Sequence, residues 1–228
     1  MVMKTILIIG AIMTSVSTVW APPAPTKTGP ATEAKIGERA DAVVPPPAVK
    51  APEVDQAEIE TAVAASVEML LARQEGPTKA EWPYQGVYRV GATDDDPESL
   101  IEGRGRRRTV IPIGYRVGGT SIVGNALLRV PGCDEDDMRR AALERARSFV
   151  VTSTSHANMN PKYDGGYDVR GWGYIYGGDF LLAMRERGFV ADADRDRHDA
   201  AIQFYLDGLA AIEIPEVGGW NYARRGPL

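Results

Sequence analysis

Two glycine-rich segments that are apolar on nearly every side constrain the fold of this chain most strongly. They are Gly-Gly-Thr-Ser-Ile-Val-Gly-Asn-Ala-Leu-Leu at 118–128 and Trp-Gly-Tyr-Ile-Tyr-Gly-Gly-Asp-Phe-Leu-Leu at 172–182. A helix that lacks a polar face is typically buried. Three other segments carry apolar residues at helical spacing on one face and polar residues on the other. The pattern therefore predicts buried helices that alternate along the chain with solvent-facing ones.

Five helices are expected after residue 53, and each is bounded by a capping residue or by a glycine or proline stop. The expected ranges are 55–75, 120–130, 134 to about 150, 172–187 and 196–214. The residues expected to face the core are Ile59, Val63, Val67, Leu70, Leu71, Ile122, Val123, Ala126, Leu127, Met138, Ala142, Ala146, Phe149, Val150, Ile175, Tyr176, Phe180, Met184, Ala201, Ile202, Tyr205, Leu209 and Ile212.

An internal repeat supports a modular fold. Gly-Gly-Tyr-Asp-Val-Arg-Gly at 165–171 and Gly-Gly-Trp-Asn-Tyr-Ala-Arg-Arg-Gly at 218–226 share Gly-Gly-aromatic-Asp/Asn followed by Arg-Gly. A weaker copy, Gly-Val-Tyr-Arg, occupies 86–89 after the first expected helix. The two copies begin 53 residues apart, at Gly165 and Gly218. A period of about this length is typical of repeat architectures, in which each unit buries its apolar face against its neighbour.

In its alternating helices and its motifs Arg-Gly-Trp-Gly-Tyr (170–174) and Gly-Gly-Trp-Asn-Tyr (218–222), the chain resembles the terpenoid-cyclase and protein-prenyltransferase α/α-toroid superfamily. The form it resembles is the squalene-cyclase-like repeat of exported bacterial proteins. The resemblance covers roughly 55–228 and implies an all-α toroid of alternating outer and inner helices. True squalene cyclases carry a Gln five residues before the repeat Trp, where this chain has Pro215.

The resemblance also implies an incomplete ring. Toroids of this superfamily close with more helix pairs than five helices supply, so we expect an arc of about two and a half repeats. Such an arc leaves apolar sides of inner helices uncovered. We expect either C-terminal truncation of a longer toroid or a partner chain that covers the open arc.

The N-terminal region predicts export. Lys4 precedes an apolar stretch at 6–13 and then small residues, which is the pattern of a signal peptide in residues 1–21. Cleavage and retention as a signal anchor both remain open, and either gives a periplasmic, extracytoplasmic or secreted protein. Eight prolines among Ala, Thr and Lys mark 22–52 as an extended linker. The folded domain is therefore expected at 53–228.

Composition and charge exclude several classes of protein. The net charge of −5 argues against nucleic-acid binding, which depends on clustered positive charge. One cysteine, Cys133, and two histidines give no pattern for a metal site, so neither metal nor cofactor is expected. Cys133 also lacks the Gln three residues later that a thioester needs, because Asp136 stands there.

Two acidic runs resemble terpene-enzyme motifs but have simpler interpretations. Asp-Glu-Asp-Asp at 134–137 opens an outer helix, where carboxylates cap free N–H groups. Asp-Asp-Asp-Pro-Glu at 94–98 contains a proline and is followed by Arg-Gly-Arg-Arg-Arg at 104–108. We interpret the first run as a helix cap and the second as part of an acidic and basic surface insertion.

The segment 156–179 carries the strongest candidate site. In a toroid, the ends of inner helices border the central cavity, where ligand pockets form. Aromatic rings with carboxylates and an arginine suit a sugar ring or a uronate chain. The candidate ligand-binding residues are Tyr163, Asp164, Tyr167, Asp168, Arg170, Trp172, Tyr174, Asp179, Trp220, Tyr222 and Arg224.

Three functions remain open. The favoured one is a binding domain that takes a ligand or partner on its concave face, since the Arg-Gly and aromatic positions recur in both repeats. In that case Arg170 and Arg224 hydrogen-bond loop carbonyls. A polysaccharide lyase or other carbohydrate-active enzyme using 156–179 is the second. An isoprenoid cyclase or transferase is the third, and it rests on fold analogy alone.

Overall fold

The computed structural model describes only part of the second of two compact units, Met1–Ala51 and Pro52–Leu228. The described residues are 55–86, 88–162, 169–214 and 218–220. The expected signal at 1–21 and linker at 22–52 lie outside them, as do residues 163–168 and 221–228.

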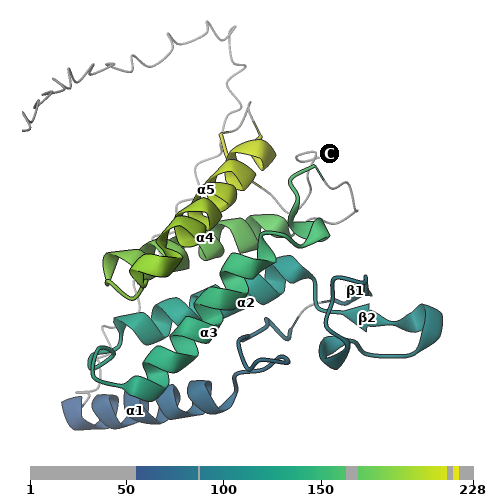
Figure 1. Ribbon diagram of the computed structural model, residues 1–228. Coiled ribbons are helices and arrows are strands. Elements are labelled where there is room, and N and C mark those ends of the chain that lie inside the picture. Colours follow the sequence, from purple (N-terminus) through teal and green to yellow (C-terminus); the bar gives the residue numbers. More distant parts are fainter. Residues whose placement is uncertain (1–54, 87, 163–168, 215–217, 221–228) are drawn as a thin grey trace, which may run out of the picture. The chain divides into compact units, whose positions relative to one another are not determined.

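The described residues are mostly helical, which confirms the all-α class (Figure 1). The described residues also contain two antiparallel strands of two residues each, with Val90 opposite Val110, and four short 3₁₀ helices. The elements are α1 Gln56–Ala72, β1 Val90–Gly91, η1 Glu98–Leu100, η2 Gly105–Arg107, β2 Thr109–Val110, α2 Ile113–Arg129, α3 Asp137–Ser153, η3 Ala157–Met159, α4 Arg170–Glu186, η4 Asp192–Asp194 and α5 Arg195–Ile212.

The helix starts follow capping chemistry. Asp55 is the N-cap of α1, as expected, because its carboxylate accepts a hydrogen bond from the Ala57 N–H. Asp136 caps α3 in the same way through the Arg139 N–H, so the interpretation of the run at 134–137 as a cap is confirmed. The expected start of α2 near Thr120 was wrong, because α2 begins directly after Pro112.

Helices α2 and α4 lie against each other with their chains parallel. A Cβ atom at Gly114 would stand 2.7 Å from the Val169 carbonyl oxygen, and one at Gly124 would stand 2.5 Å from the Phe180 ring. Contacts therefore advance in the same direction along both helices. Glycine at these positions allows the close approach, because any side chain would collide with the neighbouring helix.

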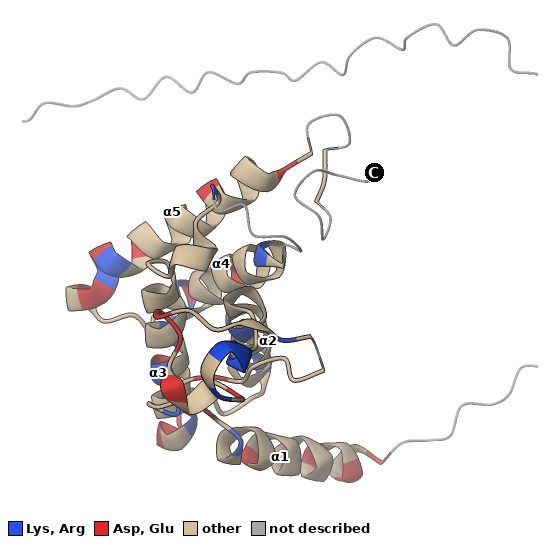
Figure 2. Cartoon of the chain, turned by 90° about the vertical axis from the view of Figure 1, so that its right-hand side faces the viewer, with Lys and Arg blue, Asp and Glu red and all other residues tan. Residues whose placement is uncertain are grey.

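Helices α3 and α5 run opposite to this pair. Figure 1 shows α3 beside α2, and α5 beside α4. The Tyr174 ring meets Gly208, and the buried His198 contacts the Leu181 carbonyl, so α4 and α5 are antiparallel. In Figure 2, α2 and α4 carry few charged residues, while the first turns of α5 carry both signs.

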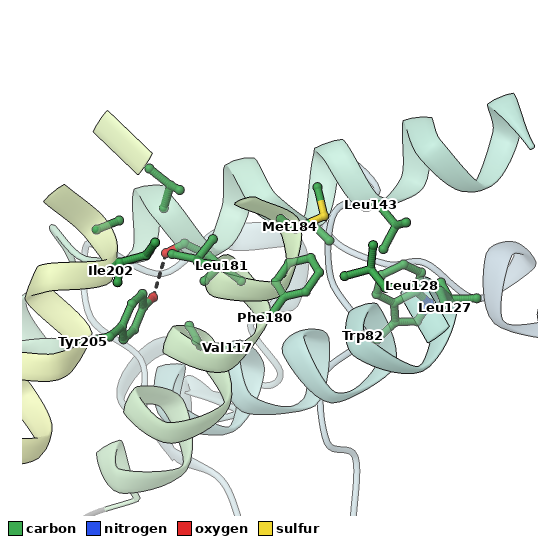
Figure 3. Close-up of a cluster of buried hydrophobic side chains, with 14 of the residues drawn as sticks. Trp82, Val117, Leu127, Leu128, Leu143, Phe180, Leu181, Met184, Ile202 and Tyr205 are labelled. Carbon is green, nitrogen blue, oxygen red and sulfur yellow. Dashed lines mark hydrogen bonds between the residues drawn. The ribbon is translucent and has the colours of Figure 1, made fainter. Parts of the chain in front are cut away.

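The core lies between α2, α3, α4 and α5 (Figure 3). Tyr174, Tyr205 and Phe180 are the largest side chains with no exposed surface. The Tyr205 hydroxyl donates to the Val150 carbonyl oxygen at 2.7 Å, which satisfies its only donor. Burial of α2 and α4, expected from their lack of a polar face, is thus confirmed for most of α2 and for about half of α4.

Several expected core residues are exposed. Met138 is 76% exposed in the first turn of α3, and Ile175 of α4 is 43% exposed. Ile59 and Val63 are also exposed, since only the C-terminal end of α1 reaches the core. Ile122 of α2 is exposed as well.

None of the described helices is long and apolar enough to span a membrane.

Candidate functional site

Residues 80–85 lie along α2 and are held there by specific contacts. The Trp82 N–H donates to Thr120 Oγ1 at 2.9 Å, and its indole N–H donates to the Leu70 carbonyl oxygen at 2.7 Å. A Cβ atom at Gly119 would stand 2.5 Å from the Trp82 carbonyl oxygen and 2.8 Å from the Tyr84 nitrogen. Glycine on α2 therefore lets the backbone of this segment approach the helix.

A buried ion-pair network fixes the same segment. The Arg116 guanidinium donates from Nε to Glu81 Oε2 at 2.8 Å and from Nη2 to Glu81 Oε1 at 3.0 Å. Its Nη1 donates to Asp96 Oδ1 at 3.1 Å. All three side chains are at most 3% exposed. Charge-assisted bidentate pairs of this kind are geometrically specific, so α2, residues 80–85 and residues 93–97 are locked together.

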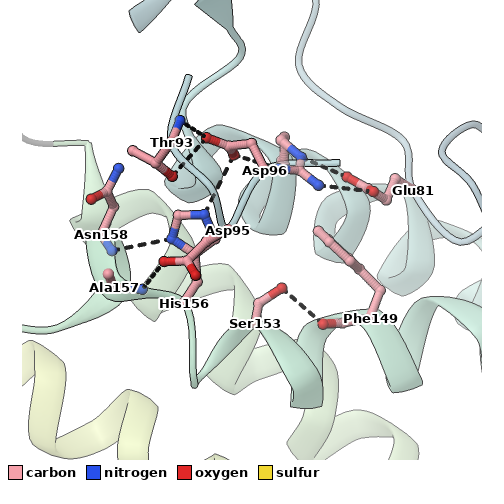
Figure 4. Close-up of polar contacts among 10 residues, drawn as sticks. Glu81, Thr93, Asp95, Asp96, Phe149, Ser153, His156, Ala157 and Asn158 are labelled. Carbon is pink, nitrogen blue, oxygen red and sulfur yellow. Dashed lines mark hydrogen bonds and ion pairs between the residues drawn. The ribbon is translucent and has the colours of Figure 1, made fainter. Parts of the chain in front are cut away.

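Asp96 also receives hydrogen bonds from two other residues (Figure 4). His156 Nδ1 accepts from the Asn158 N–H, so its Nε2 carries the proton that points at Asp96 Oδ1, 3.4 Å away. Thr93 donates to Asp96 Oδ2 through its N–H and its hydroxyl. Burial alone would raise the pKa of Asp96, but the hydrogen bonds from His156 and Thr93 hold it below its usual value.

The anchored segment presents an aromatic surface, which we define as Tyr84, Tyr88, Tyr115, Trp172 and Tyr176. The Tyr84 ring stacks on Trp172 with 5.8 Å between centroids and 24° between planes. Tyr115 packs edge-on against Trp172 at 5.7 Å, and Trp172 contacts Tyr176 at 5.5 Å. Tyr84 and Tyr88 are 48% and 39% exposed. The surface joins residues of α2, α4 and the segment before β1.

Arg170 and Tyr174 were expected to bind ligand, but they are buried structural residues. Arg170 donates from Nη1 to the Asn160 carbonyl oxygen, and the Tyr174 hydroxyl donates to the Met159 carbonyl oxygen. Tyr174 has no exposed surface and Arg170 is buried. Both side chains hold the turn after η3 against α4, as the structural interpretation of Arg170 anticipated.

The other predicted site residues are dispersed. Trp172 belongs to the aromatic surface, whereas Asp179 accepts a hydrogen bond from Asn125 at 2.7 Å and lies 3.9 Å from Arg129. Trp220 is exposed and donates to the Leu209 carbonyl oxygen. Tyr163, Asp164, Tyr167, Asp168, Tyr222 and Arg224 lie outside the described residues.

Sequence reasoning missed Tyr84, Tyr88 and Tyr115 as members of this surface. The available signal was the weak repeat copy at 86–89, which contains Tyr88. The interpretation of the acidic run at 94–98 as a surface insertion is right for Glu98 and wrong for Asp96. Glu98 does pair with Arg108 at the surface, as the insertion hypothesis expected, but Asp96 is buried against Arg116, so that interpretation was wrong for Asp96.

Positive charge lies near the aromatic surface in sequence. The hairpin that follows Tyr88 carries Arg104, Arg106 and Arg107, all exposed. Within the part of the chain that the structure describes, no group of three His, Cys, Asp or Glu residues is placed to hold a metal ion. The described residues therefore offer exposed tyrosine rings, with exposed arginines in the hairpin that follows them in sequence. No protein-family model, no curated protein and no solved structure matches this chain.

Proposed function

We propose that residues 53–228 form an α/α-toroid-type repeat domain. The proposal is supported by the buried character of α2 and α4, which alternate along the chain with α1, α3 and α5, and by the parallel packing of α2 and α4, with α5 antiparallel to α4. Helices that alternate in this way stack outer–inner hairpins side by side. The exposed Ile122 and Ile175 on the inner pair fit a face that further repeats or a partner chain cover.

The domain's function in this proposal is to bind an acidic glycan on the aromatic surface. The observation that carries it is the stacking of the exposed Tyr84 ring on the half-buried Trp172. The apolar C–H face of a pyranose ring packs on such a ring face, and tyrosine adds a hydroxyl at its edge. Because Glu81, Trp82 and Gly119 fix the backbone beside Tyr84, little conformational entropy is lost on binding.

The exposed arginines favour an anionic sugar over a neutral one. Arg104, Arg106 and Arg107 project from the hairpin that begins two residues after Tyr88. Guanidinium groups form bidentate hydrogen bonds with carboxylates, which a uronate carries on every ring. A polyuronate is therefore the substrate class that we assign to this surface.

Binding without catalysis is the form of the proposal that the described residues support. His156 lies in the segment 156–179, and both of its ring nitrogens are in use: Nδ1 accepts from the Asn158 N–H and Nε2 donates to Asp96. A general base needs a free lone pair within reach of the substrate proton. An export signal at 1–21 remains part of the proposal, because polyuronates are polymers that a protein meets outside the cytoplasm.

Affinity electrophoresis of the full chain tests the proposal. Gels containing polygalacturonate are expected to retard the chain more than gels containing neutral dextran, and added salt is expected to reduce the difference. The variant with Arg104, Arg106 and Arg107 replaced by alanine should lose the preference for polygalacturonate. Equal migration in both gels contradicts the proposal.

A further inference from the structure

A separate pocket of about 480 Å³ lies beside the C-terminal half of α3. Residues of the segments 77–81 and 95–97 also line it, and Ile113 and Phe149 give it apolar surface. Its volume lies in the range of small-molecule sites. Figure 4 shows Asp95 and Phe149 among the side chains of this region. The aromatic surface shares none of the lining residues, so the two places can be occupied independently.

The buried charges of this pocket are already paired with each other. Arg116 donates to both carboxylate oxygens of Glu81, and its Nη1 donates to Asp96. Among the Asp, Glu and Arg residues that line the pocket, this leaves one exposed cation, Arg145, and one exposed carboxylate, Asp95. The lining therefore has no excess charge, and it offers a ligand one group of each sign.

These two charges lie at opposite ends of the pocket. Asp95 Oδ2 accepts a hydrogen bond from the Ala157 N–H, in η3, which follows the C-terminus of α3. Arg145 lies in the middle of α3 and donates from Nε to the Lys79 carbonyl oxygen at 2.9 Å. Between Arg145 and Ser153, α3 rises about 12 Å. A ligand that pairs with both residues must therefore carry its own charges well apart.

Both end groups keep hydrogen-bonding capacity that the described residues do not use. Arg145 engages Nε and Nη2, so its Nη1 donors are free within the part of the chain that the structure describes. Asp95 likewise keeps its Oδ1, since the Ala157 N–H bonds to Oδ2. An ammonium group fits the first of these charges that is negative, at Asp95, and a carboxylate fits the guanidinium of Arg145.

The lining also offers both donors and acceptors. Among the described residues, the hydroxyls of Ser148 and Thr78 donate to no acceptor, so both remain available to a ligand. Ser153 Oγ donates to the Phe149 carbonyl oxygen at 2.8 Å, which leaves its lone pairs as acceptors. A peptide group carries one N–H and one carbonyl oxygen, and it can use both kinds of partner.

We propose that this pocket binds a short extended peptide of about three residues with both ends free. Its ammonium group pairs with Asp95 and its carboxylate with Arg145. A chain of three residues spans at most about 11 Å, and a hydrogen bond of about 2.9 Å at each end extends its reach. Its peptide groups bond to Ser148 and Ser153, and an apolar side chain packs on Phe149. The site is independent of the glycan proposal.

Calorimetric titration of the full chain with the tripeptide Ala-Leu-Ala, its N-acetylated form and its C-terminal amide tests this inference. Each blocked form lacks one terminal charge and keeps the rest of the molecule. The unblocked tripeptide is expected to bind, and each blocked form is expected to bind at least about fivefold more weakly. Equal affinity for all three peptides, or binding of none, overturns the proposal. Equal binding of the unblocked and N-acetylated forms also overturns it, because the site would then recognise the C-terminus of any chain.

A matched pair of variants locates the binding. Asp95→Asn removes the charge and keeps an oxygen for the Ala157 N–H, whereas Asp94→Asn removes an exposed charge that does not line the pocket. Asp95→Asn should bind Ala-Leu-Ala about fivefold more weakly and should no longer discriminate against the N-acetylated form. Asp94→Asn and Tyr84→Ala should bind as the original chain does, and thermal melting of each variant checks its folding. If Asp95→Asn melts normally and still prefers the unblocked peptide, the proposal is wrong.

Discussion

Arg116 holds Glu81 through two hydrogen bonds, at 2.8 and 3.0 Å, between side chains that are each only 3% exposed. The pair joins α2 to the segment that carries Tyr84. It is therefore the link between the buried helix α2 and the aromatic surface. Because the ions are desolvated, the pair tolerates loss of one partner poorly.

Glu81→Ala should destabilise the fold by about 3 kcal/mol, since it leaves the buried Arg116 with Asp96 as its remaining carboxylate. Urea denaturation followed by circular dichroism measures the change in the free energy of unfolding. Glu98→Ala is the matched control, because it breaks an exposed pair with Arg108 and should cost less than about 1 kcal/mol. Equal losses in both variants contradict a structural role for the buried pair.

Gly119→Ala should weaken both the fold and glycan binding, because its Cβ would stand 2.5 Å from the Trp82 carbonyl oxygen. Backbone atoms cannot move aside as a flexible side chain does, so we expect a loss of about 1–3 kcal/mol. Gly178→Ala is the control within a helix, as its Cβ would meet Tyr205 only at 3.5 Å. That variant should be neutral or slightly stabilising. If both variants melt alike, the close approach at Gly119 is not essential.

His198 predicts acid sensitivity of the fold. Burial lowers its pKa below the ordinary 6.5, although a hydrogen bond with the Leu181 carbonyl acts in the opposite direction. Its Nδ1 has no hydrogen-bond partner among the described residues. The unfolded chain therefore binds a proton at a higher pH than the folded chain does. The contribution of His198 to stability is complete above pH 6.5 and is lost as the pH falls through the folded-state pKa.

Denaturation curves between pH 8 and pH 5 check this dependence. The slope contributed by one proton cannot exceed about 1.4 kcal/mol per pH unit. His198→Gln keeps a donor for the Leu181 carbonyl and removes the titration, so its curve should be flatter over this range. The same pH dependence in the original chain and in His198→Gln would assign the effect to another group.

The sequence predicts the helices better than it predicts the site. The absence of a polar face on 118–128 and 172–182 correctly predicted burial, because that pattern is local and belongs to one element. Asp55 correctly predicted the start of α1 for the same reason. The acidic run at 134–137 correctly predicted a cap, although α3 begins at Asp137 and not at the expected Asp134. The first turns of α2 could not be predicted as part of a buried helix because they contain Arg116. Its burial depends on Glu81 and Asp96, which lie far away in the sequence.

The aromatic surface depends on contacts between distant residues. Glu81 and Arg116 are 35 positions apart, and Asn125 and Asp179 are 54 apart. Periodicity within one segment does not reveal such pairs. Tyr174 and Trp172 are neighbours on α4, yet one is completely buried and the other takes part in the aromatic surface. The placement of α5 and of residues 80–85 decides that difference.

Calorimetric titration of oligogalacturonate into the full chain, Tyr84→Phe and Tyr84→Ala measures whether the glycan binds at the Tyr84 ring. Tyr84→Phe keeps the ring that stacks on Trp172, and Tyr84→Ala removes it. We expect Tyr84→Phe to bind nearly as well as the original chain and Tyr84→Ala to lose about tenfold or more in affinity. Equal binding by all three proteins would contradict the assignment of the glycan site to the aromatic surface.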